Sequence, residues 1–139
     1  MAILHRLRER LFGKHPQRLL LAKELVTSVI DLAKNNYPNE FVALVHGVIG
    51  KDIIADYLLY QTYKSSRHSA TIHQSYDFPM LAGSIGSVHS HPGGNEPSSA
   101  DLQFFSKSGI VHIIIGMPYN QETIAVYDNL GRRLRFEVI

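Results

Sequence analysis

The residues best suited to chemistry lie close together in the second half of the chain. His89 and His91 are separated by one residue at the predicted end of a strand. Alternate residues of a strand point the same way, so both imidazoles can face one point. Asp101 follows after a turn, in the predicted first turn of a helix. Two neutral imidazoles and one carboxylate leave a fourth position open. That is the ligand count of a catalytic zinc site, where zinc activates water and polarises a carbonyl.

Each of these residues also has a structural explanation. Paired histidines at a strand end often only bond to the main chain, so His89 and His91 alone indicate a metal weakly. Ser98 and Asp101 fit a helix-capping box, with Asp in place of the usual Glu. Glu40, far earlier in the chain, fits a solvated acid before a strand. The metal site is favoured because all these residues occur together, in order, with the right elements between them.

The elements that must position these residues follow from hydrophobic periodicity and turn signals. Residues 17–35 place their apolar side chains largely on one face of a helix, which ends at Asn35–Pro38. The polar segment 65–77 is predicted to be a long loop or flap. The other expected elements are strands over 41–48, 53–63, 85–89 and 110–115, a helix over 98–107, and a hairpin of 123–127 with 134–138. This order predicts a single mixed α/β domain.

Length and composition narrow the class of protein further. The chain has 139 residues, of which 45% are hydrophobic and 19% are charged, which fits one compact domain with a buried core. It has no cysteine, which excludes disulfides, thiol nucleophiles and thiolate metal sites. No apolar run reaches the roughly 20 residues of a membrane span, and the N-terminus lacks the features of a secretory signal. We therefore expect a cytoplasmic protein with no membrane span.

With these features the sequence resembles the JAMM (MPN+) metalloprotease family. The family pattern is a distant Glu, then His-Ser/Thr-His-Pro, then Ser-x-x-Asp, which this chain matches with Glu40, His89–Pro92 and Ser98–Asp101. The resemblance runs from the first long helix, near Gln17, to the C-terminus, and it is to the small single-domain archaeal and bacterial members. It implies the α/β MPN fold, a cytidine-deaminase-like fold in which a mixed β-sheet is flanked by helices.

The resemblance also implies a role for each matching residue. His89, His91 and Asp101 correspond to the zinc ligands of the family, which implies one Zn²⁺ per chain. Glu40 stands where the family places its general base, between the first helix and the first strand. Ser98 corresponds to the serine that helps to stabilise the oxyanion.

One departure from the family pattern concerns the loop between the proline and the serine. The family usually has six residues there, whereas Gly93–Pro97 is one residue shorter. Taking Ser99 as the serine would restore the gap but would put Leu102 at the aspartate position, and leucine cannot ligate zinc. We therefore keep Ser98 with its aspartate, and we expect the two glycines of the loop to absorb the missing residue.

The activity that the resemblance implies is zinc-dependent hydrolysis of peptide or isopeptide bonds. Family members remove ubiquitin-like modifiers from conjugates or process sulfur-carrier proteins that end in Gly-Gly. The polar segment 65–77 is then the flap that would pair with the substrate tail by strand addition. Two alternatives remain open. One is a metal-free interaction module of the same fold. The other is a nucleic-acid-associated MPN protein, although such relatives commonly carry Asn between the histidines, where this chain has Ser90.

Residues 1–15 are predicted to form a basic arm in front of the JAMM/MPN+ domain, which covers 16–139. Leucines at helical spacing predict a short amphipathic helix over Ala2–Phe12. Such an arm suits RNA, an acidic lipid surface or an acidic protein partner, or it is simply a docking arm or a frayed terminus. The net charge of +2 is too small to indicate nucleic acid by itself. A homodimer is among the assemblies that the sequence allows. The basic residues of the arm are Arg6, Arg8, Arg10 and Lys14.

Overall fold

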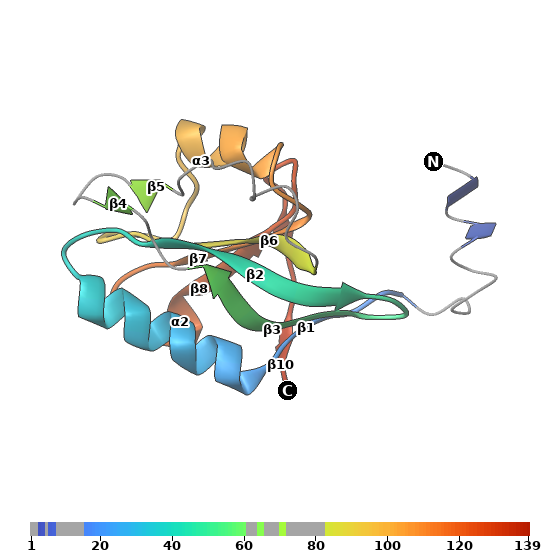
Figure 1. The fold of residues 1–139 in the computed structure, drawn as a ribbon, viewed down its shortest axis with the longest axis horizontal. Coiled ribbons are helices and arrows are strands. Elements are labelled where there is room, and N and C mark those ends of the chain that lie inside the picture. Colours follow the sequence, from blue (N-terminus) through green and yellow to red (C-terminus); the bar gives the residue numbers. More distant parts are fainter. Residues whose placement is uncertain (1–2, 5, 8–15, 61–63, 66–69, 72–82) are drawn as a thin grey trace.

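A mixed β-sheet forms the frame of the fold (Figure 1). The computed structural model describes residues 3–4, 6–7, 16–60, 64–65, 70–71 and 83–139. Within these residues, eight strands pair in the order β10-β1-β3-β2-β6-β7-β8-β9. The elements are β1 Leu19–Leu21, α2 Lys23–Asn36, β2 Val42–Ile49, β3 Ile53–Tyr60, β6 Ser84–Ser90, α3 Ser99–Phe105, β7 Val111–Ile115, a short 3-10 turn Gln121–Thr123, β8 Ile124–Tyr127, β9 Arg133–Leu134 and β10 Glu137–Val138.

The centre of the sheet brings the start of β2 to the end of β6. These strands are antiparallel, and Val42 pairs with His89. Residues just before β2 therefore lie beside residues just after β6. On its other side β6 runs parallel to β7, with Ser90 opposite Ile115. This register gathers three chain segments, which are distant in sequence, at one end of the sheet.

The C-terminal strands show that the sheet curls round. β9 pairs with β8 at one edge, while β10 pairs in parallel with β1 at the opposite edge. Only two residues, Arg135 and Phe136, separate β9 from β10, so the two edges must come close together. The predicted hairpin of 123–127 with 134–138 is therefore correct only in part. Its second strand divides at Phe136, whose partly buried ring packs on the main core.

Helix α2 packs on one face of the sheet and supplies four buried residues, Leu25, Val26, Val29 and Ala33. The prediction that a helix begins near residue 17 is wrong, because Leu19–Leu21 forms β1 between β3 and β10. All three leucines of β1 are buried. Three apolar residues ahead of an amphipathic helix continue its hydrophobic pattern. What makes them a strand is pairing with distant parts of the chain, and periodicity does not register such pairing.

Helix α3 lies across the opposite face of the sheet from α2 (Figure 1). Its Phe104 and Phe105 contact smaller clusters on that face, built around Leu44 and Ile114. In the predicted flap, β4 (Lys64–Ser65) pairs with β5 (Ala70–Thr71), and the rest of 65–77 lies outside the described residues. In the N-terminal arm the residues described, 3–4 and 6–7, are helical and exposed. No helix in the described part of the chain has both the length and the hydrophobicity that a membrane-crossing segment requires.

Candidate metal centre

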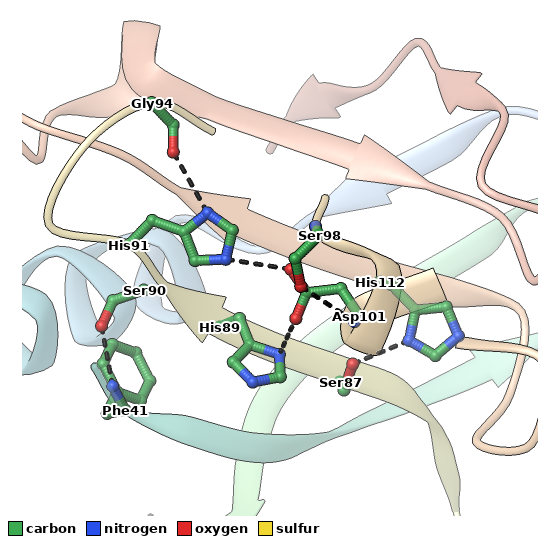
Figure 2. Close-up of polar contacts among 9 residues, drawn as sticks. All are labelled: Phe41, Ser87, His89, Ser90, His91, Gly94, Ser98, Asp101 and His112. Carbon is green, nitrogen blue, oxygen red and sulfur yellow. Dashed lines mark hydrogen bonds and ion pairs between the residues drawn. The ribbon is translucent and has the colours of Figure 1, made fainter. Parts of the chain in front are cut away.

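Strand β6 delivers both histidines to the end of the sheet. His89 is the penultimate residue of the strand and is buried, and His91 follows directly after the strand. The main-chain N–H of His91 donates to the carbonyl of Ile115 at 2.9 Å, so β7 holds His91 in line with the strand. The expected alternation therefore places the two imidazoles on the same side of the chain, as Figure 2 shows.

The N-terminus of α3 delivers the carboxylate. The main-chain N–H of Ser98 donates to Oδ2 of Asp101 at 2.8 Å, and the main-chain N–H of Asp101 donates to Oγ of Ser98 at 3.1 Å. This reciprocal pair is the capping box that the sequence predicts, and it is confirmed. The box fixes the Asp101 side chain and leaves the Ser98 hydroxyl proton free to donate elsewhere.

The three side chains converge, with the Asp101 carboxylate between the two imidazoles (Figure 2). Nε2 of His91 lies 3.0 Å from Oδ2 of Asp101, and Nδ1 of His89 lies 3.7 Å from Oδ1. Among the described residues, no group of three His, Cys, Asp or Glu side chains has an arrangement that could hold a metal ion without some movement. The separations nevertheless fit zinc, since neighbouring donors of a tetrahedral site lie about 3.4 Å apart, between the two values.

The second ring nitrogen of His91 is held by the loop that follows it. Nδ1 lies 3.1 Å from the carbonyl oxygen of Gly94 (Figure 2). A carbonyl only accepts, so Nδ1 carries a proton, and Nε2 is the nitrogen that can ligate a metal. Histidine ligands of metals are typically oriented in this way by a main-chain carbonyl.

The charges of the cluster keep the carboxylate ionised. Burial by itself raises the pKa of Asp101, but the hydrogen bonds from His91 and Ser98 and the charges of His89 and His91 hold that pKa at about 2. Burial lowers the pKa of His91, and this effect is outweighed by its hydrogen bond to Asp101 and by the negative charges around it, so the net pKa is raised. An ionised carboxylate suits a metal ligand, whereas a proton on His91 would compete with the metal as the pH falls.

Glu40 joins this cluster from the start of β2. It is half-buried, and the pairing of β2 with β6 brings it alongside His91. Burial raises the pKa of Glu40, the positive charge of His91 lowers it, and the negative charge of Asp101 raises it, with a net increase. All five residues singled out in the sequence therefore lie at one end of the sheet, and burial raises the pKa of Glu40, which makes its carboxylate a better proton acceptor than an exposed glutamate.

A buried contact that the sequence analysis missed joins Glu40 to the histidine strand. The main-chain N–H of Phe41 donates to Oγ of Ser90 at 2.8 Å (Figure 2). The main-chain N–H of Ser90 donates to the carbonyl of Phe41 at 3.0 Å. Both residues are almost fully buried. The family pattern, which allows only Ser or Thr between the two histidines, was the signal that could have indicated a role for this hydroxyl.

A second missed feature is the support beneath the loop after His91. The hydroxyl of Tyr119 donates to the carbonyl of His91 at 3.1 Å, and the hydroxyl of Tyr127 donates to the carbonyl of Asn95 at 2.9 Å. The close approach occurs at Gly116, where a Cβ would stand 2.7 Å from the carbonyl oxygen of Gly93. The glycines of the shortened loop itself have open space around them, so the expectation that they absorb the missing residue finds no steric support.

Two other histidines, His112 and His46, bond to partners outside the candidate ligand cluster. Burial lowers the pKa of His112 to about 4, and its ring bonds to Ser87 at 2.7 Å and to the Gly109 carbonyl at 3.0 Å. It is a core histidine whose two ring nitrogens both have hydrogen-bond partners. His46 lies farther along the sheet, opposite Ser84, and contacts Asp56, so it packs away from the candidate ligands.

Comparison with known proteins gives the same picture as the geometry. A family model described as prokaryotic homologs of the JAB domain matches residues 22–129. A protein of Haloferax volcanii, named "Probable metalloprotease", is 32% identical over 128 residues, which cover 86% of this chain and 78% of the relative.

Two solved structures extend the likeness to the fold. A JAB1/MPN domain protein from Archaeoglobus fulgidus superposes with a TM-score of 0.65 at 27% identity, covering 86% of this chain and 97% of that one. A structure described as "JAMM: A Metalloprotease-like Zinc Site in the Proteasome and Signalosome" superposes with a TM-score of 0.68 at 27% identity, covering 88% of this chain and 99% of that one. The chain therefore belongs to the prokaryotic homologs of the JAB domain, a metalloprotease-like family, and has their single-domain α/β MPN fold.

Proposed function

We propose that this protein is a zinc-dependent peptidase or isopeptidase that cuts after the C-terminal tail of a ubiquitin-like modifier or a sulfur-carrier protein. One observation carries the proposal: the buried Asp101 carboxylate lies between two imidazoles, with Glu40 beside them. This combination of a three-donor set and a separate acid with a raised pKa is what hydrolysis at a metal requires.

The donor set assigned to zinc is His89, His91 and Asp101, one ion per chain. When bound there, zinc supplies Lewis acidity towards the carbonyl of the scissile amide and towards water. Two neutral nitrogens and one ionised carboxylate leave a position open for substrate. The low pKa of Asp101, about 2, keeps that ligand ready over the whole physiological range.

Glu40 and Ser98 provide the remaining chemistry. Glu40 takes a proton from the attacking water as its oxygen bonds to the carbonyl carbon. The Ser98 hydroxyl donates to the oxyanion that develops on the carbonyl oxygen. When the C–N bond breaks, Glu40 returns the proton to the leaving amine. The capping box supports the role of Ser98, because its oxygen accepts from Asp101 and its proton remains available.

The substrate class rests on family resemblance and on the strand pair at the predicted flap. β4 and β5 show that extended, paired backbone occurs within the predicted flap. A strand pair of this kind suits a substrate tail that binds by strand addition. The Haloferax relative named "Probable metalloprotease" is consistent with proteolysis as the reaction class.

The test is cleavage of defined conjugates by the zinc-loaded protein. A ubiquitin-like modifier is joined to a reporter in two ways, through a linear peptide bond and through a lysine isopeptide bond. We expect release at the end of the modifier tail, loss of release with a zinc chelator, and recovery when zinc is restored. Cleavage that survives complete zinc removal, or no cleavage of either conjugate, would contradict the proposal.

We also propose that residues 1–15 act as an arm that is separate from the chemistry of 16–139. The family match begins only at residue 22, and the proposed ligands and acid lie beyond it. Deletion of 1–15 should therefore leave zinc content and cleavage of a short peptide near those of the full chain. Loss of either property in the deletion would place the arm within the domain.

A further inference from the structure

The buried hydroxyl of Ser90 lies between the two proposed histidine ligands but faces away from them, towards the segment that carries Glu40. Its Oγ accepts a hydrogen bond from the main-chain N–H of Phe41 at 2.8 Å (Figure 2). Its own N–H donates to the Phe41 carbonyl at 3.0 Å. Both main-chain groups of Phe41 are thus bonded to one residue, 49 positions later in the chain. Oγ of Ser90 replaces the main-chain partner that a regular strand would offer.

Glu40 stands between a turn and a strand, and the turn is held by a hydrogen bond from the N–H of Asn39 to the carbonyl of Asn36 at 2.7 Å. Glu40 precedes β2, which begins at Val42. On its other side Tyr37, Pro38 and Asn39 form an exposed turn. Phe41, by contrast, is buried in the main core and bonded to Ser90. Phe41 is therefore the firmly held residue directly after Glu40, and its hydrogen bonds attach it to β6, the strand of the histidines.

We infer that Ser90 is a positioning residue for Glu40: by holding Phe41 it fixes the distance between the proposed general base and the proposed zinc ligands. The inference deepens the proposed function and rests on it. Reaction rates depend steeply on such distances, and a displacement of about 1 Å can cost on the order of 100-fold. The Ser90 hydroxyl carries one of the two hydrogen bonds to Phe41, and Ser90→Ala removes that bond while the bond from the Ser90 N–H remains available.

The test is a mutant cycle between Ser90→Ala and Glu40→Gln in the zinc-loaded protein. Ser90→Ala should lower kcat about 10- to 100-fold with little change in KM and with zinc content retained. In the Glu40→Gln background the same change should have almost no further effect, because the group that Ser90 positions is already gone. Ser87→Ala is the matched control, since Ser87 is equally buried in β6 but bonds to His112. It should change kcat less than about 3-fold.

Three outcomes would overturn the inference. If Ser90→Ala lowered kcat by the same factor in the Glu40→Gln protein as in the parent protein, Ser90 would act through another group. Ser90→Ala that loses zinc would make Ser90 a support of the ligands instead. Ser87→Ala with an equal loss of kcat would indicate a general effect of strand packing. Should Ser90→Ala fail to fold, Ser90→Cys keeps the volume with a weaker acceptor and goes through the same cycle.

A readout without turnover separates this inference from the proposed function. Amide hydrogen exchange at Phe41 reports the contact directly, because its N–H is protected by Oγ of Ser90. Faster exchange at Phe41 in Ser90→Ala, and restored protection in Ser90→Thr, are expected even if the parent cleaves no conjugate. Unchanged exchange would contradict the inference, whereas a parent without hydrolytic activity would contradict the proposed function alone.

Discussion

Histidine–aspartate contacts occur at two places in the described part of the chain, and the shortest of them lies outside the candidate centre. Nδ1 of His46 lies 2.6 Å from Oδ1 of Asp56, and their side chains are 21% and 35% exposed. Nε2 of His91 lies 3.0 Å from Oδ2 of Asp101, and these side chains are only 13% and 8% exposed. Distance alone would therefore select the wrong pair.

The surroundings distinguish the two pairs. His46 and Asp56 are ten residues apart on one hairpin, where the pairing of β2 with β3 is irregular. The second ring nitrogen of His46 is covered by Gly83, where a Cβ would lie 2.5 Å from it. Asp101 instead serves two imidazoles, sits in a capping box and has a pKa of about 2. Convergence and burial therefore set Asp101 apart from Asp56, and the proposed metal role predicts that substitutions at the two positions will differ in effect.

The largest contrast should come from Asp101→Asn against Asp56→Asn. The amide in Asp101→Asn can still accept from the Ser98 N–H, so the helix cap survives while the charge is lost. Zinc binding of about 10–16 kcal/mol spread over four ligands gives roughly 2.5–4 kcal/mol for each. Zinc affinity should therefore fall about 100-fold or more, and turnover with it. Asp56→Asn should leave both unchanged. Competition with a chromophoric chelator measures the zinc affinity. Equal losses of affinity in the two variants would show that Asp101 matters no more for zinc binding than Asp56 does.

Glu40→Gln should have the next largest effect, on turnover alone. The amide keeps the shape of the side chain but cannot take a proton, and general acid–base help is worth about 100- to 10,000-fold. Zinc content and melting temperature should stay near the parent, so the variant should trap a bound conjugate. Single-turnover kinetics with metal analysis checks this. Near-parental activity would remove Glu40 from the mechanism, and loss of zinc would make it a ligand.

The candidate centre was predictable from residue types because its chemistry restricts them. Only a few side chains ligate zinc, so the pair of His89 and His91 with Asp101 stands out once the spacing suits a strand, a turn and a helix. Ser90 and Tyr119 were not found this way. They act through main-chain carbonyls and N–H groups of residues far away in sequence, and a hydroxyl that bonds to backbone has no characteristic spacing.

The same contrast applies to the fold: elements with local sequence signals were predictable, and strands that depend on pairing with distant residues were not. Strands such as β7 and helix α3 were predicted from apolar runs and a capping box, which are local signals. β1 and β10 each have two or three residues and exist because they pair with each other and β1 with β3. Their sequences carry no signal of that pairing, so the sequence predicts helix at Leu19–Leu21 and one continuous strand over 134–138.

Ser98→Ala tests the capping box, which holds the side chain of Asp101 and has no counterpart at Asp56. Losing one oxyanion donor costs on the order of 100-fold in rate. Losing the cap should also cost about 1 kcal/mol of stability. Rate and denaturation are therefore measured on the same samples, with Ser99→Ala as the control at the neighbouring helical position. A silent Ser98→Ala together with a damaging Ser99→Ala would show that the shortened loop has been aligned wrongly.

The smallest effect is expected for the coupling between His46 and Asp56. His46 also stacks on Tyr57, with ring centroids 4.2 Å apart, so a single His46→Gln change loses packing as well as the polar contact. A double-mutant cycle with Asp56→Asn cancels the packing loss and isolates the pair. For a pair this exposed the coupling free energy should be about 0.2–1 kcal/mol despite the 2.6 Å contact, because solvent screens the charges. Denaturant unfolding of the four proteins measures it, and all four should bind zinc alike. A coupling free energy above about 2 kcal/mol would contradict the argument that solvent screens this pair. Loss of zinc in any of the four proteins would show that His46 and Asp56 affect the metal centre.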